Sequence, residues 1–126
     1  MDENNTCRPS EIRLGADKKT LKITFDDGLS AEITAELLRV RSPSAEVRGH
    51  TPDERKTVPG KRDVMIIGIE PVGNYAIRLT FDDMHDSGIY SWPLLHHFAS
   101  EQSTIFAEYL AELEAKGLGR ERARRT

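Results

Sequence analysis

The segment Asp82-Asp83-Met84-His85-Asp86 holds a dense group of chemically active side chains. Carboxylate oxygens and an imidazole nitrogen are ligands for divalent metals, and here they lie within one short stretch. A second interpretation is an exposed hairpin turn, because aspartate is favoured in turns for the hydrogen bonds that it makes to nearby backbone. Residue chemistry favours the turn, and a metal site at Asp82, His85 and Asp86 is the alternative.

The other histidines and the cysteine do not form ligand sets of their own. His96 and His97 are neighbours on an expected helix, where they would point roughly 100° apart and could not share one metal. His50 has no partner at ligand spacing, and Cys7 has no second cysteine for a disulfide, which indicates a reducing compartment. Sequence motifs for nucleotide binding and for serine or zinc hydrolases are absent. We therefore expect no enzyme activity.

The composition indicates one small globular domain. The chain has 126 residues and a net charge of -3, with 31% charged and 37% hydrophobic residues. This balance does not favour nucleic acid or an anionic membrane as a partner. Basic residues in 41–63 and in the C-terminal tail leave a phosphate contact as a disfavoured alternative, which salt would weaken steeply. No signal peptide or membrane span is recognisable, so we expect a cytoplasmic protein.

Short stretches of alternating apolar and polar residues predict β-strands. Asp26-Asp27-Gly28 between two of them is a hairpin turn signal, because Asp and Gly tolerate positive φ. The expected strands are residues 11–14, 20–25, 29–33, 64–72, 75–81 and 88–90.

Capped segments predict three helices. Thr34 caps a short helix that ends before Pro43. Ser91 caps a second short helix, which starts at Trp92-Pro93. Ser103 caps the last helix, which ends at Gly117. The apolar residues of this last helix recur at helical spacing: Phe106, Tyr109, Leu110 and Leu113.

An internal repeat connects these elements. Thr24-Phe25-Asp26-Asp27 matches Thr80-Phe81-Asp82-Asp83, and the segment 30–34 matches 87–91. In both copies a strand, an Asp-Asp turn, a second strand and a capped short helix follow one another. We therefore predict an α+β fold, in which an antiparallel sheet is built from two β-hairpin/short-helix units plus a C-terminal helix.

Irregular segments flank and interrupt the predicted domain. Residues 1–9 are expected to form a flexible tail, and residues 10–117 form the single domain. Within it, residues 41–63 contain several prolines and glycines and no periodicity, which predicts a long loop. The arginine-rich residues 118–126 are expected to form a basic disordered tail.

Two stretches carry a family resemblance. Leu37-Leu38-Arg39 with the following Ser-Pro-Ser, and the run from Phe81 to Trp92, resemble the gamma-butyrobetaine hydroxylase-like N-terminal domain. The resemblance covers roughly residues 10–113, and the family includes stand-alone bacterial proteins of unknown function. In the hydroxylases, this domain precedes the catalytic barrel and holds a structural zinc. The zinc ligands come from a Leu-Arg-x-x-Cys-Pro-Cys-x-x-Cys segment and a later histidine.

The resemblance implies that the zinc site has changed in this chain. The four ligand positions correspond to Ser42, Ser44, Val47 and His85, so that only the histidine is retained. Such zinc sites depend on thiolate ligands, which serine hydroxyls and valine cannot replace at neutral pH. We therefore expect no cofactor, with zinc or another divalent metal as the alternative. We also expect His85 to form a hydrogen bond with Ser42 or Ser44.

The resemblance also implies a role without catalysis, because the oxygenase barrel and its iron ligands are missing. We expect a binding or assembly module that acts through a protein partner or as a homo-oligomer. Its contact surface would involve Tyr90, Trp92 and the final helix, although core packing is the simpler interpretation for these aromatic residues. Some relatives are fused to P-loop proteins associated with iron–sulfur assembly, which implies partners that handle metal cofactors.

Overall fold

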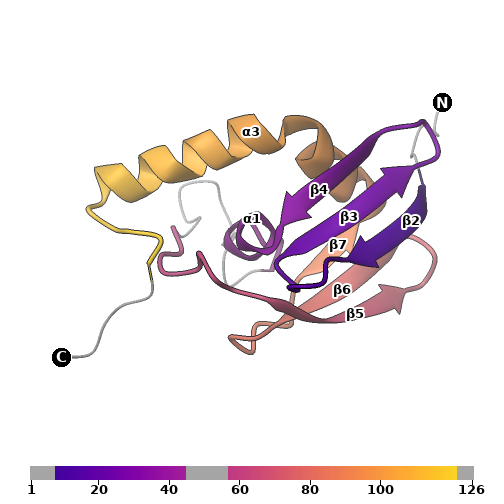
Figure 1. Cartoon of the computed structure of the whole chain (residues 1–126), viewed down its shortest axis with the longest axis horizontal. Helices are drawn as coiled ribbons and strands as arrows, with labels where there is room; N and C mark the ends of the chain where they lie inside the picture. Colours follow the sequence, from indigo (N-terminus) through magenta and orange to yellow (C-terminus); the bar gives the residue numbers. More distant parts are fainter. Residues whose placement is uncertain (1–7, 45–56, 122–126) are drawn as a thin grey trace.

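A computed structural model describes residues 8–44 and 57–121 of the chain. In these residues, two antiparallel three-stranded sheets combine with two helices into an α+β fold (Figure 1). The first sheet has the order β2-β3-β4 and is followed by α1: β2 (Pro9–Leu14), β3 (Thr20–Phe25), β4 (Ser30–Thr34) and α1 (Ala35–Val40). The second sheet has the order β5-β6-β7 and is followed by α3: β5 (Ile66–Val72), β6 (Ala76–Phe81), β7 (Ile89–Ser91) and α3 (Trp92–Ala115).

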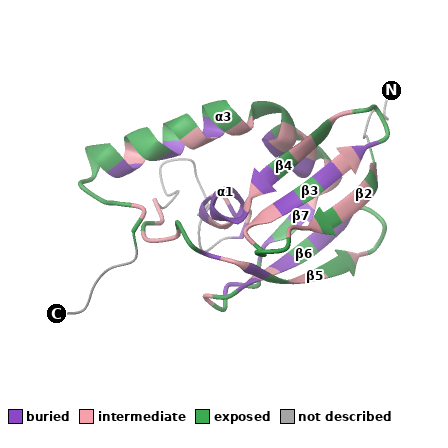
Figure 2. Ribbon diagram, viewed as in Figure 1, coloured by how far each residue is buried: buried purple, intermediate pink, exposed green. Residues whose placement is uncertain are grey.

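One hydrophobic core joins both sheets and both helices. The middle strand of each sheet alternates between buried and more exposed residues, so that each sheet turns one face inward (Figure 2). α1 and the first half of α3 add apolar side chains to the same cluster. Its members include Leu21, Ile23 and Phe25 from β3, Ile77, Leu79 and Phe81 from β6, and Leu37, Leu38, Leu95 and Phe98 from the helices.

The predicted repeat is confirmed by matching backbone contacts in the two sheets. The first strand of each sheet carries a bulge at the same place, between Pro9 and Glu11 in β2 and between Ile66 and Gly68 in β5. The sequence predicts one sheet from these units, whereas the structure has two. The sheets meet where Ile66 N donates a hydrogen bond of 2.8 Å to the carbonyl of Lys18.

The turns of the two units also match. Phe25 N donates to Leu29 O over 2.8 Å, and Phe81 N donates to His85 O over 3.0 Å. Position by position, His85 therefore corresponds to Leu29. The residue before each of them, Gly28 or Met84, has a positive φ, 93° and 74° respectively.

Two of the three predicted N-caps are present, Thr34 and Ser91, whereas Ser103 lies inside a helix and caps none. The hydroxyls of Thr34 and Ser91 accept hydrogen bonds from the backbone of α1 and α3. The expected helices at Trp92 and Ser103 form one element, α3, with a kink at Glu101 where φ is −115° and ψ is 19°. Next to the kink, the Gln102 side chain accepts from Thr34 N and donates to Glu32 O, and these bonds anchor α3 to β4.

The ends of the predicted domain are partly corrected. Pro9 already belongs to β2, so the strand begins inside the expected N-terminal tail. At the other end, residues 118–121 fold back beside residues 60–62, and Gly60 N donates to Gly119 O over 3.0 Å. This described part of the expected basic tail is held by the domain. Residues 1–7, 45–56 and 122–126 of the predicted tails and loop lie outside the described residues.

Within the described ranges, neither helix has the length and apolar character needed to cross a membrane.

The N-cap of α1 gives a first stability prediction. Replacing Thr34 by Ala removes the 3.1 Å hydrogen bond from Leu37 N to the threonine hydroxyl. We expect the free energy of unfolding to fall by about 1 kcal/mol in urea titrations. Thr104→Ala, at an exposed position inside α3, should leave it unchanged or slightly raise it. Equal losses in the two variants would contradict the capping role of Thr34.

Candidate functional site

His85, Ser42 and Ser44 form a buried polar cluster between the two units. Only 6% of His85, 2% of Ser42 and 7% of Ser44 is exposed. His85 Nε2 lies 2.9 Å from Ser42 Oγ and 3.4 Å from Ser44 Oγ. Ser44 N also donates to Ser42 Oγ over 3.3 Å. The expected hydrogen bond between the histidine and these serines is therefore present.

The chain brings this cluster together from two directions. Ser42 follows the C-terminal end of α1, and His85 lies in the turn between β6 and β7. Gly88 makes the close approach possible, because a Cβ at this position would lie 2.5 Å from Ser42 Oγ. A side chain at residue 88 would therefore push Ser42 away from His85.

Tyr90 closes the inner side of the cluster. It is completely buried, its hydroxyl donates to Leu38 O, and burial raises the pKa of its hydroxyl well above the usual value. Tyr90 therefore belongs to the core, and its expected place on a contact surface is wrong. Trp92 is partly buried against the core, with its indole nitrogen 2.9 Å from Asn74 O.

Asp83 fixes the turn that carries His85. Its carboxylate lies 2.7 Å from Arg39 Nε and 2.6 Å from Lys61 Nζ, and it accepts a hydrogen bond of 3.1 Å from His85 N. Burial would raise the pKa of Asp83, but the hydrogen bonds from Lys61, Arg39 and the His85 backbone outweigh it and lower this pKa to about 2. Nη1 of Arg39 is buried and has no hydrogen-bond partner in the described part of the chain.

The other carboxylates of the turn point elsewhere. Asp82 Oδ1 accepts a hydrogen bond of 3.1 Å from Met65 N, and Asp86 is exposed. The ring of His85 is directed to the serines instead. In residues 8–44 and 57–121, no three His, Cys, Asp or Glu side chains come together as a metal-binding group. The structure does not assemble the alternative site of Asp82, His85 and Asp86.

The residues at the family's zinc position do not fit zinc. Two of its sulfur ligands are replaced by Ser42 and Ser44, whose neutral hydroxyls bond to His85. A tetrahedral zinc site needs four ligands, each a thiolate, a carboxylate or an imidazole. Of the four residues at these positions, His85 is the one whose side chain is such a ligand. Val47, the fourth position, lies outside the described residues, but its aliphatic side chain has no ligand atom. Among the described residues, Ser42, Ser44 and His85 are hydrogen-bonded to one another.

Sequence reasoning missed the ion pair and the hydrogen bond that join the two units. Asp83 pairs with Arg39 of α1, and Asp27 lies 2.9 Å from His96 Nε2 of α3. The repeat could have predicted that the two contacts are equivalent. The two aspartates occupy the same position in the repeat, and Arg39 and His96 each follow a matching Leu-Leu pair. Each turn thus contacts the helix of the other unit.

The fold and the cluster define a small α+β domain made of two repeated units that meet at a buried serine–histidine contact. The chain belongs to the family described as gamma-butyrobetaine hydroxylase-like, N-terminal, whose model matches residues 12–96. This match confirms the resemblance seen in the sequence. No curated protein matches the chain.

Solved structures of similar proteins cover most or all of the chain. A protein with a solution NMR structure is 41% identical, with 97% of this chain and 96% of that chain covered and a TM-score of 0.81. A second NMR structure is also 41% identical, covers 100% and 94% of the two chains, and gives a TM-score of 0.81. A crystal structure from Acidithiobacillus ferrooxidans, of a protein of unknown function in the DUF971 family, is 32% identical. It covers 79% of this chain and 100% of its own, with a TM-score of 0.64.

The buried cluster predicts a large effect of His85→Ala on stability. The substitution leaves two buried hydroxyls without their shared nitrogen and removes the volume of a ring. We expect the free energy of unfolding to fall by about 2–4 kcal/mol in urea titrations.

His97→Ala is the matched control, because His97 is exposed on α3. This variant should stay within about 0.5 kcal/mol of the parent. A His85→Ala variant as stable as the control would show that the cluster does not stabilise the fold.

The low pKa of Asp83 predicts a specific acid dependence. This pKa falls from 3.8 to about 2 on folding, so the ionised carboxylate stabilises the fold above about pH 4. The contribution, about 2 kcal/mol, should be lost as the pH falls through 2. Asp83→Asn should therefore be less stable than the parent at pH 7, and the difference should shrink between pH 4 and pH 2.

Asp63→Asn controls for general acid effects, since the side chain of Asp63 is 74% exposed and pairs only loosely with Lys19. Its stability should follow the parent within about 0.5 kcal/mol across the range. An Asp83→Asn variant that behaves like this control would contradict the assigned ion pairs.

Proposed function

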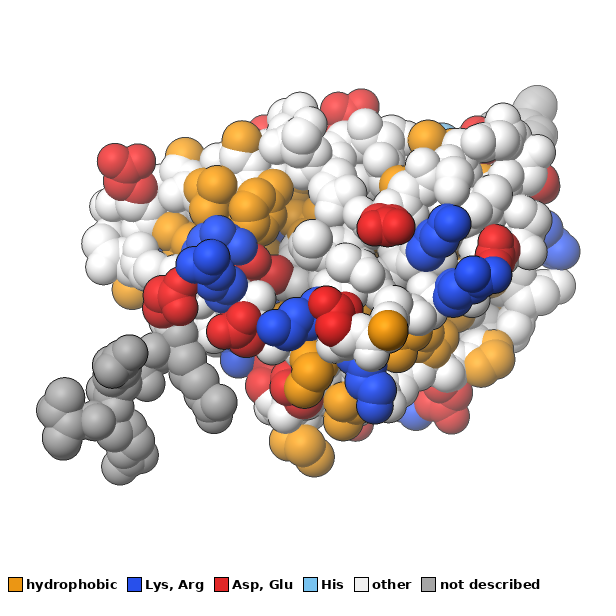
Figure 3. Space-filling model, in the orientation of Figure 1, with side chains coloured by type: hydrophobic (Ala, Val, Ile, Leu, Met, Phe, Trp, Pro, Cys, Tyr) orange, Lys and Arg blue, Asp and Glu red, His pale blue; other side chains and the backbone are white. Residues whose placement is uncertain are grey.

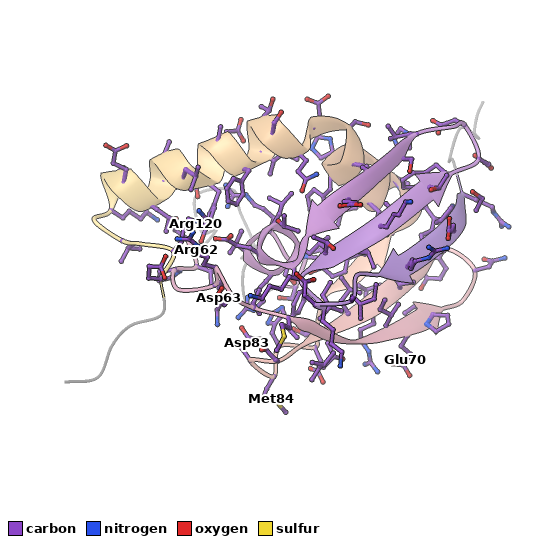
Figure 4. All side chains as sticks on the ribbon, viewed as in Figure 1. Arg62, Asp63, Glu70, Asp83, Met84 and Arg120 are labelled. Atoms are coloured by element: carbon purple, nitrogen blue, oxygen red, sulfur yellow. The ribbon has the colours of Figure 1, made fainter. Side chains whose placement is uncertain are left out.

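We propose that this domain is a non-catalytic protein-binding module that presents Met84 to a partner. Met84 lies at the tip of the β6–β7 turn, and 77% of it is exposed. In Figure 4 its side chain points away from the body of the molecule. This exposed apolar side chain on a firmly held turn is the observation that carries the proposal.

The backbone at Met84 supports a role for its side chain. Its φ of 74° lies in the left-handed region, which costs a residue with a Cβ roughly 1–2 kcal/mol. The equivalent residue of the first unit is Gly28, which adopts such a φ without that cost. Strain of this kind tends to occur at functional positions. A contact between the methionine side chain and a partner would account for a strained residue at this position.

The turn holds Met84 in place on both sides. Asp83, before it, is paired with Arg39 and Lys61, and His85, after it, is fixed by the buried serines. Asp82 is bonded to the backbone of Met65. A flexible thioether on such a rigid base adapts to a partner surface at little further loss of backbone entropy.

The bonding of the polar groups supports a role other than catalysis. His85 and Asp83 are the residues of the turn best suited to acid–base chemistry, and both are engaged with neighbouring side chains inside the protein. Each would have to give up these contacts before it could reach a substrate.

Exposed Ile67 on β5 and Ile89 on β7 add apolar surface on the same sheet as the turn.

The family resemblance suggests which partners to test first. The resemblance implies that some relatives are fused to P-loop proteins associated with iron–sulfur assembly, so we propose proteins that handle metal cofactors as partners. A second copy of this chain is the other partner to examine. Both would be measured by NMR titration of the isotope-labelled chain with purified protein.

Met84→Gly separates binding from folding. Glycine relieves the positive φ, so the free energy of unfolding should stay equal or rise by up to about 1 kcal/mol. Partner affinity should fall at least tenfold, because the exposed side chain is gone. An unchanged affinity would refute the role of Met84, and a chain that binds neither an iron–sulfur assembly protein nor itself would refute the proposed partners.

Lys18→Gly is a matched control for this experiment. Lys18 is exposed and also has a positive φ, 64°, but it lies in the turn between β2 and β3. The substitution relieves comparable backbone strain and should leave partner affinity unchanged.

A further inference from the structure

Glu36 is a buried carboxylate on α1 that needs a cationic partner. Only 5% of this residue is exposed, and an unpaired charge at such a depth strongly destabilises a fold. Arg120 supplies the partner through two parallel hydrogen bonds, with Nε 2.8 Å from Oε2 and Nη2 2.7 Å from Oε1. This forked contact matches the planar geometry of a guanidinium group, which lysine cannot reproduce.

An aromatic ring completes the arginine contact. The guanidinium carbon of Arg120 lies 5.1 Å from the centre of the Phe106 ring, within the range of a cation–π interaction. A carboxylate and an aromatic face thus contact one guanidinium group. Figure 3 shows the hydrophobic side chains along α3 next to basic and acidic side chains on this face.

The arginine does not fill the space around it. A cavity of about 340 Å³ lies here, lined by Thr34, Glu36, Gln102, Ser103, Phe106 and Arg120. One third of the Arg120 side chain, 33%, is exposed. The contact is therefore open to solvent on one side, and another group can approach it.

The segment that carries Arg120 is held by few contacts. We call residues 118–121 the strap; it follows the turn at Gly117, where φ is 66°. Two backbone hydrogen bonds join it to the segment 60–62, Gly60 N to Gly119 O and Arg62 N to Arg120 O, both 3.0 Å. The ion pair of Arg62 with Glu121 is exposed and contributes little. Figure 4 shows Arg120 and Arg62 side by side below α3.

We propose that Glu36 and Phe106 form a binding site for an arginine side chain of a partner protein, and that the strap is its intramolecular competitor. A partner segment in extended conformation would take the place of the strap. Its arginine would pair with Glu36, and its carbonyls would accept from the backbone N–H groups of Gly60 and Arg62. This inference rests on the proposed protein-binding function and adds the chemistry of the partner.

The test uses the full chain with Arg120→Ala and a peptide with the strap sequence, acetyl-Leu-Gly-Arg-Glu-amide. NMR titration should show the peptide binding Arg120→Ala at least tenfold more tightly than the parent, whose own Arg120 competes. The same peptide with lysine in place of arginine should bind at least tenfold more weakly. Adding Glu36→Gln to Arg120→Ala should abolish binding.

Equal binding of the lysine peptide, or binding that survives Glu36→Gln, would overturn the proposal. So would a folded Arg120→Ala variant that does not bind the arginine peptide. If Arg120→Ala does not fold, Arg120→Lys keeps a positive charge beside Glu36 without the fork, and the same comparisons apply. Met84 lies on a different turn, so Met84→Gly should bind the peptide as the parent does. The two proposals can therefore fail separately.

Discussion

An ion pair and a hydrogen bond that cross between the two repeated units constrain the rest of the structure. The turn aspartate of each unit reaches the helix of the other, Asp27 to His96 and Asp83 to Arg39. Each sheet is therefore tied to the helix that follows the opposite sheet. This exchange brings the end of α1 against the β6–β7 turn, and the buried cluster of His85 forms at this junction.

The two crossing contacts differ in burial, and the more buried one is connected to residues 60–62 and to the strap. The side chains of Asp27 and His96 are partly exposed, whereas those of Arg39 and Asp83 are only 13% and 19% exposed. A buried pair needs additional hydrogen bonds to offset desolvation, and Lys61 provides one. The segment that carries Lys61 then pairs with the strap, whose Arg120 neutralises Glu36 on the same helix. Charges at both ends of α1 thus organise residues without regular secondary structure.

Local patterns in the sequence were sufficient to predict most of the strands, two of the three N-caps and the repeat. Thr34 and Ser91 cap helices because this preference depends only on neighbouring backbone groups. The hydrogen bond of His85 with the serines could be predicted because the family resemblance placed these residues together. The strap could not, because the contact of Glu36 with Arg120 joins residues 84 positions apart. An arginine-rich end without periodicity looks the same in sequence whether or not it finds a buried carboxylate.

Comparison with the first unit shows the structural role of the buried cluster in the second unit. Leu29 corresponds to His85, and Ala99, three residues beyond His96, corresponds to Ser42, three residues beyond Arg39. Both are apolar and pack against the hydrophobic core at the equivalent junction. In the second unit, hydrogen bonds among His85, Ser42 and Ser44 close it. The common requirement is a filled, rigid junction beneath the turn. The proposed presentation of Met84 depends on that rigidity, and apolar packing and hydrogen bonds are two different chemistries that can supply it.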